Sequence, residues 1–162
     1  MVFLQSRDLR YQCMNEAIIR SATEHDLSEV LELYRHLHPH DPDLEMAAAE
    51  RVWSTLLASS AMTVIVAQVA DRLVSSCTLA IVPNLSRGGR SYGVIENVVT
   101  HADYRRQGLG QRVLAQALDL AWQAVCYKVL LATGSKQETT LRFYEEAGFT
   151  RGGKTYFEVR RP

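Results

Sequence analysis

The spacing of hydrophobic positions changes along the chain, and each change marks a predicted element. A short apolar run over 15–20, centred on Ala17-Ile18-Ile19, is typical of a strand. Hydrophobic residues then recur at helical spacing until Pro39, which predicts a helix. A second helix is predicted over about 44–59. The apolar face of the first helix would consist of Leu27, Val30, Leu31, Tyr34 and Leu37.

The period then shortens to that of extended strands. Residues 62–68 are rich in β-branched side chains, and Ala70-Asp71 is suited to a tight turn. A second strand over 73–82 would complete a hairpin. Residues 92–100 predict a third, strongly hydrophobic strand.

The clearest helix covers 109–125, and a short buried strand follows over 129–132. Another helix over about 137–147 ends at Gly148, and the tail 154–159 is predicted to be a last strand. The alternation of strands and helices indicates one mixed α/β domain. The apolar face of the 109–125 helix consists of Leu109, Val113, Leu114, Ala117, Leu118, Ala121, Trp122 and Val125.

Length and charge narrow the classes of function. The 162 residues suit a single domain, which we place over 14–162 with an optional extension over 1–13. The 18 Lys and Arg residues balance the 18 Asp and Glu residues, so no overall field attracts nucleic acid or an anionic membrane. The apolar stretches are shorter than the roughly 20 residues that a membrane span needs. We expect neither nucleic acid nor membrane as a partner.

The three cysteines, Cys13, Cys77 and Cys126, are odd in number and widely spaced. This pattern argues against a disulfide framework or a zinc knuckle and fits a reducing compartment. The first residues show no secretory apolar region after a basic start. We therefore expect a cytoplasmic protein.

The segment between the 92–100 strand and the next helix carries the clearest chemical signal. It reads Arg105-Arg106-Gln107-Gly108-Leu109-Gly110. The first turn of a helix has N–H groups without partners and partial positive charge, which favours an anion. Glycines at 108 and 110 would let a diphosphate approach these amides. The alternative is an ordinary charged surface turn, while the Walker and dinucleotide-binding patterns are absent.

A second motif, Phe143-Tyr144-Glu145-Glu146-Ala147-Gly148-Phe149, closes the last predicted helix. Together with Ile95-Glu96-Asn97-Val98-Val99 and the Arg105–Gly110 turn, it resembles the GNAT superfamily of general amine N-acetyltransferases. The motifs lie in the order and at the separation usual for that family. The resemblance implies a central, mostly antiparallel twisted sheet that is splayed in the middle, with helices on both faces.

The same resemblance implies acetyl-CoA as the donor of the acetyl group, with no metal. Gln137 stands where the family usually has Asn, which leaves the contact on the far side of CoA open. The implied cofactor-binding residues are Val98, Val99, Arg105, Arg106, Gln107, Gly108, Leu109, Gly110 and Gln137.

Roles in catalysis are also expected. Glu96, on the strand that would border the thioester, is the candidate base that removes a proton from the amine, directly or through water; the alternative is a solvent-facing or ion-paired structural residue. The neighbouring Asn97 is expected to point to the opposite sheet face because strand side chains alternate. A backbone N–H near Val99 would stabilise the oxyanion, and Tyr144 would protonate the leaving thiolate. Cys126 is expected to be a small buried apolar residue.

The acceptor is less defined. We expect the acceptor to be a primary amine of a small molecule. The alternatives are acetylation of a protein or peptide, and a non-catalytic regulatory domain that binds acyl-CoA. A homodimer is also possible. Cys126-Tyr127-Lys128-Val129 resembles the glucosamine-6-phosphate N-acetyltransferase branch, although Asn97 stands where that branch commonly has Asp. A polar segment with the residue types of a metal site contains His36, His38, His40, Asp41 and Asp43. We expect it instead to be a polar loop that lines the acceptor site.

Overall fold

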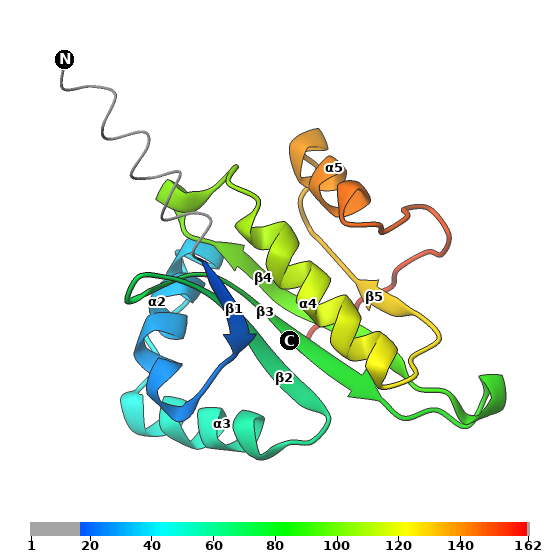
Figure 1. The fold of residues 1–162 in the computed structure, drawn as a ribbon, viewed down its shortest axis with the longest axis horizontal. Helices are drawn as coiled ribbons and strands as arrows, with labels where there is room; N and C mark the ends of the chain where they lie inside the picture. The colour runs from blue at the N-terminus through cyan, green and yellow to red at the C-terminus, as the bar shows by residue number, and fades with distance from the viewer. Residues whose placement is uncertain (1–16, 162) are drawn as a thin grey trace.

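The computed structural model describes residues 17–161, so the proposed extension over 1–13 lies outside the described residues. Within them the chain forms one five-stranded sheet whose strands lie in sequence order (Figure 1). Neighbouring strands are antiparallel except for the last pair, which is parallel. The strands are β1 (Ile18–Ser21), β2 (Met62–Val69), β3 (Arg72–Val82), β4 (Tyr92–Thr100) and β5 (Val129–Leu131).

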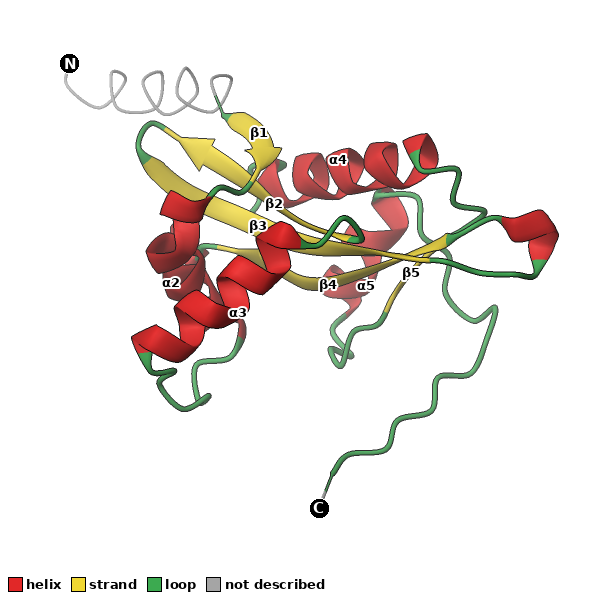
Figure 2. Ribbon diagram, turned by 90° about the horizontal axis from the view of Figure 1, so that it is seen from below, coloured by secondary structure: helices red, strands yellow, loops and turns green. Residues whose placement is uncertain are grey.

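Helices cover both faces of this sheet (Figure 2). Helices α2 (Leu27–Leu37) and α3 (Met46–Ala58) pack on one face, and α4 (Leu109–Gln123) packs on the other. Helix α5 (Glu138–Glu146) adds its apolar residues to the α4 side. This arrangement confirms the mixed α/β fold with a mostly antiparallel sheet and helices on both faces.

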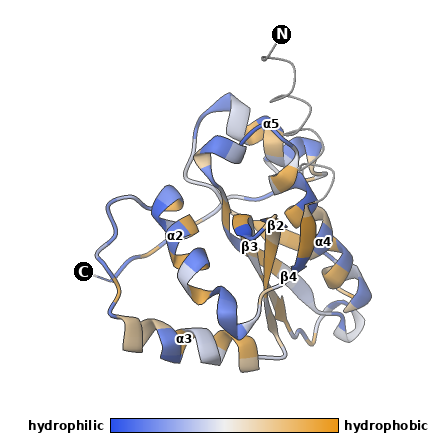
Figure 3. Cartoon of the chain, turned by 60° about the vertical axis from the view of Figure 1, so that its left-hand side comes forward, coloured by the Kyte–Doolittle hydropathy of each residue, from blue (hydrophilic) through white to orange (hydrophobic). Residues whose placement is uncertain are grey.

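Two hydrophobic cores, one on each face of the sheet, hold the layers together. The strands and the sides of the helices that face them are accordingly rich in hydrophobic residues (Figure 3). On the α4 face, Leu114 and Val113 pack over the sheet without any exposed surface. On the other face, Val30 and Leu33 of α2 and Trp53 of α3 cover β2 and β3. The apolar spacing that predicted these helices therefore corresponds to real contacts with the sheet.

Strands β4 and β5 separate after a short stretch of pairing. Their ladder joins Gly93 to Val129, Val94 to Leu130 and Ile95 to Leu131, and stops there. From Glu96 onward, β4 is paired only with β3 among the described strands. This confirms the splayed sheet that was expected, and it leaves one edge of the 96–100 segment without a neighbouring strand.

A β-bulge interrupts β4 at the point where it leaves β5. Ser76 pairs with Val99, but Thr78 pairs with Glu96, so β4 has one residue more than β3 between these pairs. Asn97 has a φ of 54°, in the left-handed region that Asn tolerates better than most residues. The Asn97 side chain lies close enough to the Tyr34 hydroxyl of α2 to influence its pKa, on the face where Glu96 and Thr78 lie. The prediction that Asn97 points to the opposite face is wrong, because the bulge breaks the alternation.

The predicted last strand over 154–159 is also wrong. This tail runs as extended chain on the side of the sheet where α2 and α3 lie (Figure 2), and no strand is assigned to it. Its apolar side chains are mostly exposed, with Phe157 87% and Val159 97% accessible. Alternating apolar residues form a strand only when another strand supplies backbone partners, and none of the described strands lies beside this tail.

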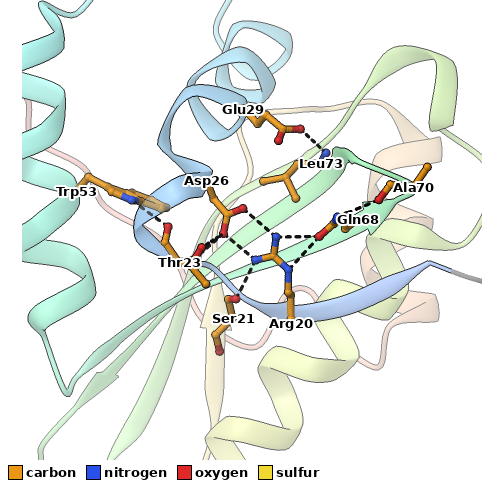
Figure 4. A network of polar contacts seen from close by, with 9 residues as sticks. All are labelled: Arg20, Ser21, Thr23, Asp26, Glu29, Trp53, Gln68, Ala70 and Leu73. Carbon is orange, nitrogen blue, oxygen red and sulfur yellow. Dashed lines mark hydrogen bonds and ion pairs between the residues drawn. The ribbon is translucent and has the colours of Figure 1, made fainter.

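A network of polar contacts anchors the start of α2 to the sheet (Figure 4). The Arg20 guanidinium on β1 donates to both carboxylate oxygens of Asp26, at 2.7 and 2.8 Å. The same carboxylate accepts from the backbone N–H and the hydroxyl of Thr23, and Arg20 also donates to Gln68 on β2. Because these donors favour the charged form, led by Arg20, the pKa of Asp26 falls to about 2.

We predict that Asp26→Asn lowers the free energy of unfolding by about 2 kcal/mol at pH 7. The pKa of Asp26 is depressed by folding from 3.8 to about 2, so its contribution is complete above pH 4 and is lost as the pH falls towards 2. Urea unfolding at pH 7 and at pH 2.5 should therefore show a large difference between the wild type and the variant only at pH 7.

The matched control for this substitution is Asp43→Asn. Asp43 makes an ion pair with Arg35, but its side chain is 93% exposed, so its removal should hardly change the unfolding midpoint at either pH. An equal loss of stability at both pH values in Asp26→Asn would show that Asp26 acts through packing and not through its charge.

Candidate active site

The turn that follows β4 is held by its own side chains. After Thr100 the chain makes a short 3₁₀ helix, η3 (Ala102–Tyr104), before α4 begins at Leu109. Arg105 folds back so that its Nε donates to the Thr100 carbonyl at 3.1 Å. Gln107 likewise donates from Nε2 to the Asp103 carbonyl at 3.2 Å. Both side chains therefore shape the loop, and the nearby Arg106 is exposed and makes no ion pair with a described residue.

The backbone of this turn presents a row of N–H groups. Arg106 has a φ of 60° and Gly108 a φ of 76°, and these two left-handed residues curl the chain into the start of α4. No described residue accepts a hydrogen bond from the N–H groups of 106–111; the first bond of the helix runs from Arg112 N–H to the Gly108 carbonyl. The space above Gly108 is open, since a Cβ there would meet no atom within 4 Å. The turn therefore has the geometry of an anion-binding cradle at a helix N-terminus.

Gly110 has a different role from the one that the sequence predicted. It is buried, and a Cβ at this position would lie 3.1 Å from both the Phe143 ring of α5 and the Thr100 hydroxyl. The glycine thus allows α4, α5 and the end of β4 to pack closely. Gly108, and not Gly110, is the glycine that leaves the cradle open.

A buried histidine, which sequence reasoning missed, supports the base of this turn. His101 is 7% exposed, its Nδ1 accepts from the Asp103 N–H at 3.2 Å, and its ring lies 4.2 Å from that of His36 on α2. Arg72 of β3 contacts His101 Nε2 at 3.0 Å. Burial, followed by the charges of His36 and Arg72, lowers the pKa of His101, which favours a neutral ring. A lone histidine after a strand gives no sequence signal for such a supporting role.

Tyr144 is positioned by the end of α5. Gly148 has a φ of 94°, and its N–H donates to the Glu145 carbonyl while the Phe149 N–H donates to the Tyr144 carbonyl. These two bonds form a Schellman motif, which confirms Gly148 as the C-terminal cap. The motif brings the Phe149 ring to 6.4 Å from the Tyr144 ring, edge on, and the Phe143 ring lies 5.0 Å from it. Two aromatic rings therefore pack against Tyr144.

The environment of Tyr144 keeps its proton in place. Burial raises the pKa of the phenol above its usual value of about 10, and the nearby Cys77 and Glu96 charges raise it further. The phenol therefore stays protonated at neutral pH. Glu96 therefore lies near enough to Tyr144 for its negative charge to affect the phenol.

Glu96 lies on the sheet face opposite α4. It pairs with Thr78 across the ladder and is exposed, directly before the bulge. On the same face, the Tyr34 hydroxyl of α2 lies beside Thr78 and Asn97. Glu96 stands where β5 diverges from β4, near enough to Tyr144 of α5 for its charge to raise the pKa of the phenol.

The remaining candidate residues divide into backbone and exposed positions. Val99 is 5% exposed in the α2-side core, and Val98 is half-buried against the α4-side core. Both lie on the section of β4 whose edge is not paired with β5. Gln137 is exposed at the N-cap of α5, where its carbonyl accepts from the Thr140 and Leu141 N–H groups, and its contact with a cofactor stays a prediction.

The described cysteines are buried thiols. Burial raises the pKa of Cys77 to about 12 and also raises the pKa of Cys126. Cys126 is 8% exposed, which confirms it as a small buried residue. In the part of the chain that the structure describes, no three His, Cys, Asp or Glu side chains are placed to hold a metal ion. Nor is any helix among those residues long and apolar enough to cross a membrane.

Comparison with known proteins identifies the relatives of this chain. The family described as Acetyltransferase (GNAT) matches residues 27–149. A glucosamine 6-phosphate N-acetyltransferase from Trypanosoma brucei brucei is 36% identical over 131 residues, which cover 81% of this chain and 87% of the relative.

Two solved structures have the same fold. One from Agrobacterium tumefaciens, proposed to be an acetyltransferase, is 42% identical with a TM-score of 0.85, covering 89% of this chain and 99% of the other. A glucosamine-6-phosphate N-acetyltransferase from Arabidopsis thaliana has a TM-score of 0.78 over 88% of this chain and 97% of the other; at 20% identity it supports the fold alone.

Proposed function

This chain belongs to the GNAT acetyltransferase family, and on that premise we propose that it transfers the acetyl group of acetyl-CoA to a primary amine of a small molecule by direct attack in a ternary complex. One observation carries the proposal. The unpaired N–H groups of 106–111 lie at the end of the strand whose free edge holds Glu96, and Tyr144 lies close to that edge.

The residues of the donor side fit a CoA thioester. The N–H groups of 106–111, with Arg106 nearby, would hold the pyrophosphate, because helix dipole, unpaired donors and open space coincide there. The unpaired edge of β4 at Val98 and Val99 would hydrogen-bond the pantetheine arm. Gln137 at the N-cap of α5 is proposed to contact CoA from the side opposite the cradle.

On the acceptor side, Glu96 is proposed as the base. An amine is mostly protonated at neutral pH, so it must lose a proton before it attacks the thioester carbonyl. Glu96 is an exposed carboxylate on the face where the acceptor can approach, and water can connect it to the amine. Tyr34, Thr78 and Asn97 form a polar neighbourhood that could orient this water.

On the donor side, Tyr144 is proposed as the acid. The oxyanion that forms during attack would accept a hydrogen bond from a backbone N–H near Val99. The CoA thiolate would then take the proton of the Tyr144 phenol, which the raised pKa retains for this step. No cysteine nucleophile is required, and both described thiols are buried.

The names of the relatives narrow the choice of acceptor amine. The Trypanosoma relative that aligns over most of its length is named for glucosamine 6-phosphate. Tyr127 and Lys128 lie beside the start of β4, in the segment whose sequence resembles that branch. We therefore propose glucosamine 6-phosphate as the first acceptor to test.

The function is tested by turnover with acetyl-CoA over a panel of amines. Release of CoA should be fastest with glucosamine 6-phosphate and slow with a peptide that has a free N-terminus or lysine. Mass spectrometry should find the acetyl group on the amine nitrogen. If no amine in the panel accelerates CoA release, the chain is a non-catalytic acyl-CoA-binding domain; if a peptide is preferred, its acceptor is a protein.

The role of Tyr144 is tested by Tyr144→Phe. Loss of the phenol should reduce kcat by about tenfold to a thousandfold, because the thiolate would leave without a proton donor, while the affinity for acetyl-CoA stays nearly unchanged. Steady-state kinetics and calorimetric binding of CoA separate the two effects. Tyr104→Phe is the matched control, since Tyr104 is a half-buried tyrosine outside the proposed chemistry. Unchanged kcat in Tyr144→Phe removes this residue from the mechanism.

The cradle is tested at Gly108 with two isosteric side chains. Gly108→Asp places a carboxylate where the pyrophosphate would lie, so CoA binding should weaken by about a hundredfold. Gly108→Asn introduces a side chain of the same shape as Asp but without its charge, and it must adopt the same left-handed backbone. It should therefore weaken CoA binding much less than Gly108→Asp does. Calorimetry with CoA measures both. Equal affinities of the two variants would contradict an anion site at this turn.

A further inference from the structure

The buried ring of His101 lies between helix α2 and the turn that leads into the cradle. It is 4.2 Å from the His36 ring of α2 and 5.6 Å from the Tyr104 ring of η3, edge on. The His101 backbone is also fixed, because its N–H donates to the Val74 carbonyl and its carbonyl accepts from the Tyr104 N–H, both at 2.9 Å. The cradle begins at Arg106, two residues after Tyr104. A change in the state of this ring therefore acts on the turn directly before the cradle.

Both ring nitrogens of His101 face hydrogen-bond donors. Nδ1 accepts from the Asp103 N–H at 3.2 Å, and Nη2 of Arg72 lies 3.0 Å from Nε2. A guanidinium and a backbone N–H can only donate. A neutral imidazole has one accepting nitrogen, so each of its tautomers satisfies one of these two donors, whereas an imidazolium satisfies neither. The contacts around His101 therefore require a neutral ring.

The charges around His101 also oppose a proton on its ring. Arg72 is permanently charged and lies against Nε2. Two carboxylates favour a charged ring, but Glu32 is exposed and already accepts from Arg72 at 3.0 Å. The other, that of Asp103, lies 3.9 Å from Nδ1 and is 83% exposed. Burial of the ring is thus compensated poorly. The charged and titratable groups that face it are His36 and Glu32 of α2, Arg72 of β3, and Asp103 and Tyr104 of η3.

The turn that His101 caps has few bonds of its own. Within η3, the Tyr104 N–H donates to the His101 carbonyl at 2.9 Å and the Arg105 N–H donates to the Ala102 carbonyl at a long 3.4 Å. The bond from the Asp103 N–H to Nδ1 is the side-chain cap of this single turn. A proton on Nδ1 would turn that nitrogen into a donor, which would face the Asp103 carboxylate and release the backbone N–H. Loss of the cap therefore loosens the segment on which the cradle is built.

From these contacts we infer that His101 is a positioning residue of the cradle and that its protonation loosens the cradle, so that acyl-CoA binding weakens as the pH falls. The inference rests on the proposed function and adds a means of regulating its donor site. A positive charge on His101 would also attract the pyrophosphate, which acts in the opposite direction. The sign of the measured effect therefore decides between a positioning role and a purely electrostatic one.

The first test compares the CoA affinity of two proteins by calorimetry at pH 8 and pH 5. His101→Asn keeps an acceptor oxygen near the place of Nδ1 but cannot gain a proton. CoA itself titrates in this range, so the ratio of Kd at pH 5 to Kd at pH 8 is compared between proteins. This ratio should be about fivefold to tenfold larger in the wild type than in His101→Asn. Equal ratios, or a larger ratio in the variant, would overturn the inference.

The matched control for this substitution is His25→Asn. The His25 side chain is 87% exposed and contacts Glu24 in η1, away from the groups that face His101. This variant also removes one titrating imidazole, and it should keep the wild-type ratio of the two Kd values. A ratio in His25→Asn as small as that in His101→Asn would show that the effect comes from the overall charge, and the inference would be wrong.

The second test follows the ring of His101 itself. Since binding and protonation are linked reciprocally, a ligand that prefers the neutral ring must make that ring harder to protonate. NMR titration of the assigned imidazole signals, with and without saturating CoA, should show that CoA moves the His101 titration to lower pH. A tenfold change in affinity corresponds to about one pH unit. A titration that CoA leaves unchanged, or moves to higher pH, would contradict the positioning role.

A second variant keeps the inference testable if His101→Asn does not fold, which thermal unfolding at both pH values would reveal. Arg72→Gln retains His101 but removes the cation beside Nε2 and leaves Glu32 without this partner. Both changes ease protonation of the ring, because burial, His36 and Arg72 together lower the pKa of His101. The loss of CoA affinity in Arg72→Gln should therefore begin at a higher pH than in the wild type. The same onset in both proteins would overturn the inference.

These measurements also separate the inference from the proposed function. If the wild type binds no CoA at pH 8, the proposed function and the inference are both wrong. If CoA binds with the same pH dependence in the wild type and in His101→Asn, the inference alone is wrong. If the expected pH dependence appears but no amine is acetylated, the proposed reaction is wrong and the role of His101 in acyl-CoA binding stands.

Discussion

The bulge at Asn97 is the constraint on which the rest of the site depends. One extra residue in β4 shifts the faces of the strand, so that Glu96 and Val99 lie towards α2 while Ile95 and Val98 lie towards α4. Without it, regular alternation would carry Val99 to the α4 side, away from the core that it now fills. The bulge also coincides with the end of pairing to β5. A single backbone irregularity thus exposes a carboxylate, keeps two hydrophobic cores intact and frees a strand edge.

The backbone strain of this arrangement lies in one short segment, and neighbouring side chains stabilise that segment. Left-handed backbone occurs at Asn97, Arg106 and Gly108, within one stretch from the bulge to the start of α4. Each of these conformations is costly for a residue with a Cβ, and Gly108 is the one position where it is free. The surrounding contacts maintain them: Asn97 lies beside Tyr34, Arg105 donates back to the Thr100 carbonyl, and buried His101 fills the base of the turn. The folded core therefore stabilises a loop whose amides are left available.

The elements that depend on local sequence patterns could be predicted from the sequence. The bounds 92–100 of β4 and the start of α4 at Leu109 follow from β-branched runs and helical periodicity, and both are confirmed. The tail 154–159 has the same alternation as a strand but lacks a neighbour, and pairing partners are not encoded locally. The face of Asn97 depends on register with β3, and the role of Gly110 depends on the approach of Phe143 from α5.

The sheet divides the proposed chemistry between its two faces. Tyr144 belongs to the α4 side, where burial keeps its phenol protonated, while Glu96 lies exposed on the α2 side. The two proposed groups are nearest to each other where the pairing of β4 with β5 stops, because the edge of β4 has no strand beside it from Glu96 onward among the described residues. In the proposed reaction the amine would therefore approach from the face of Glu96, and the thiolate would leave towards Tyr144. Both described thiols are buried and their pKa values are raised, so neither is suited to act as a nucleophile, which agrees with the proposed direct transfer.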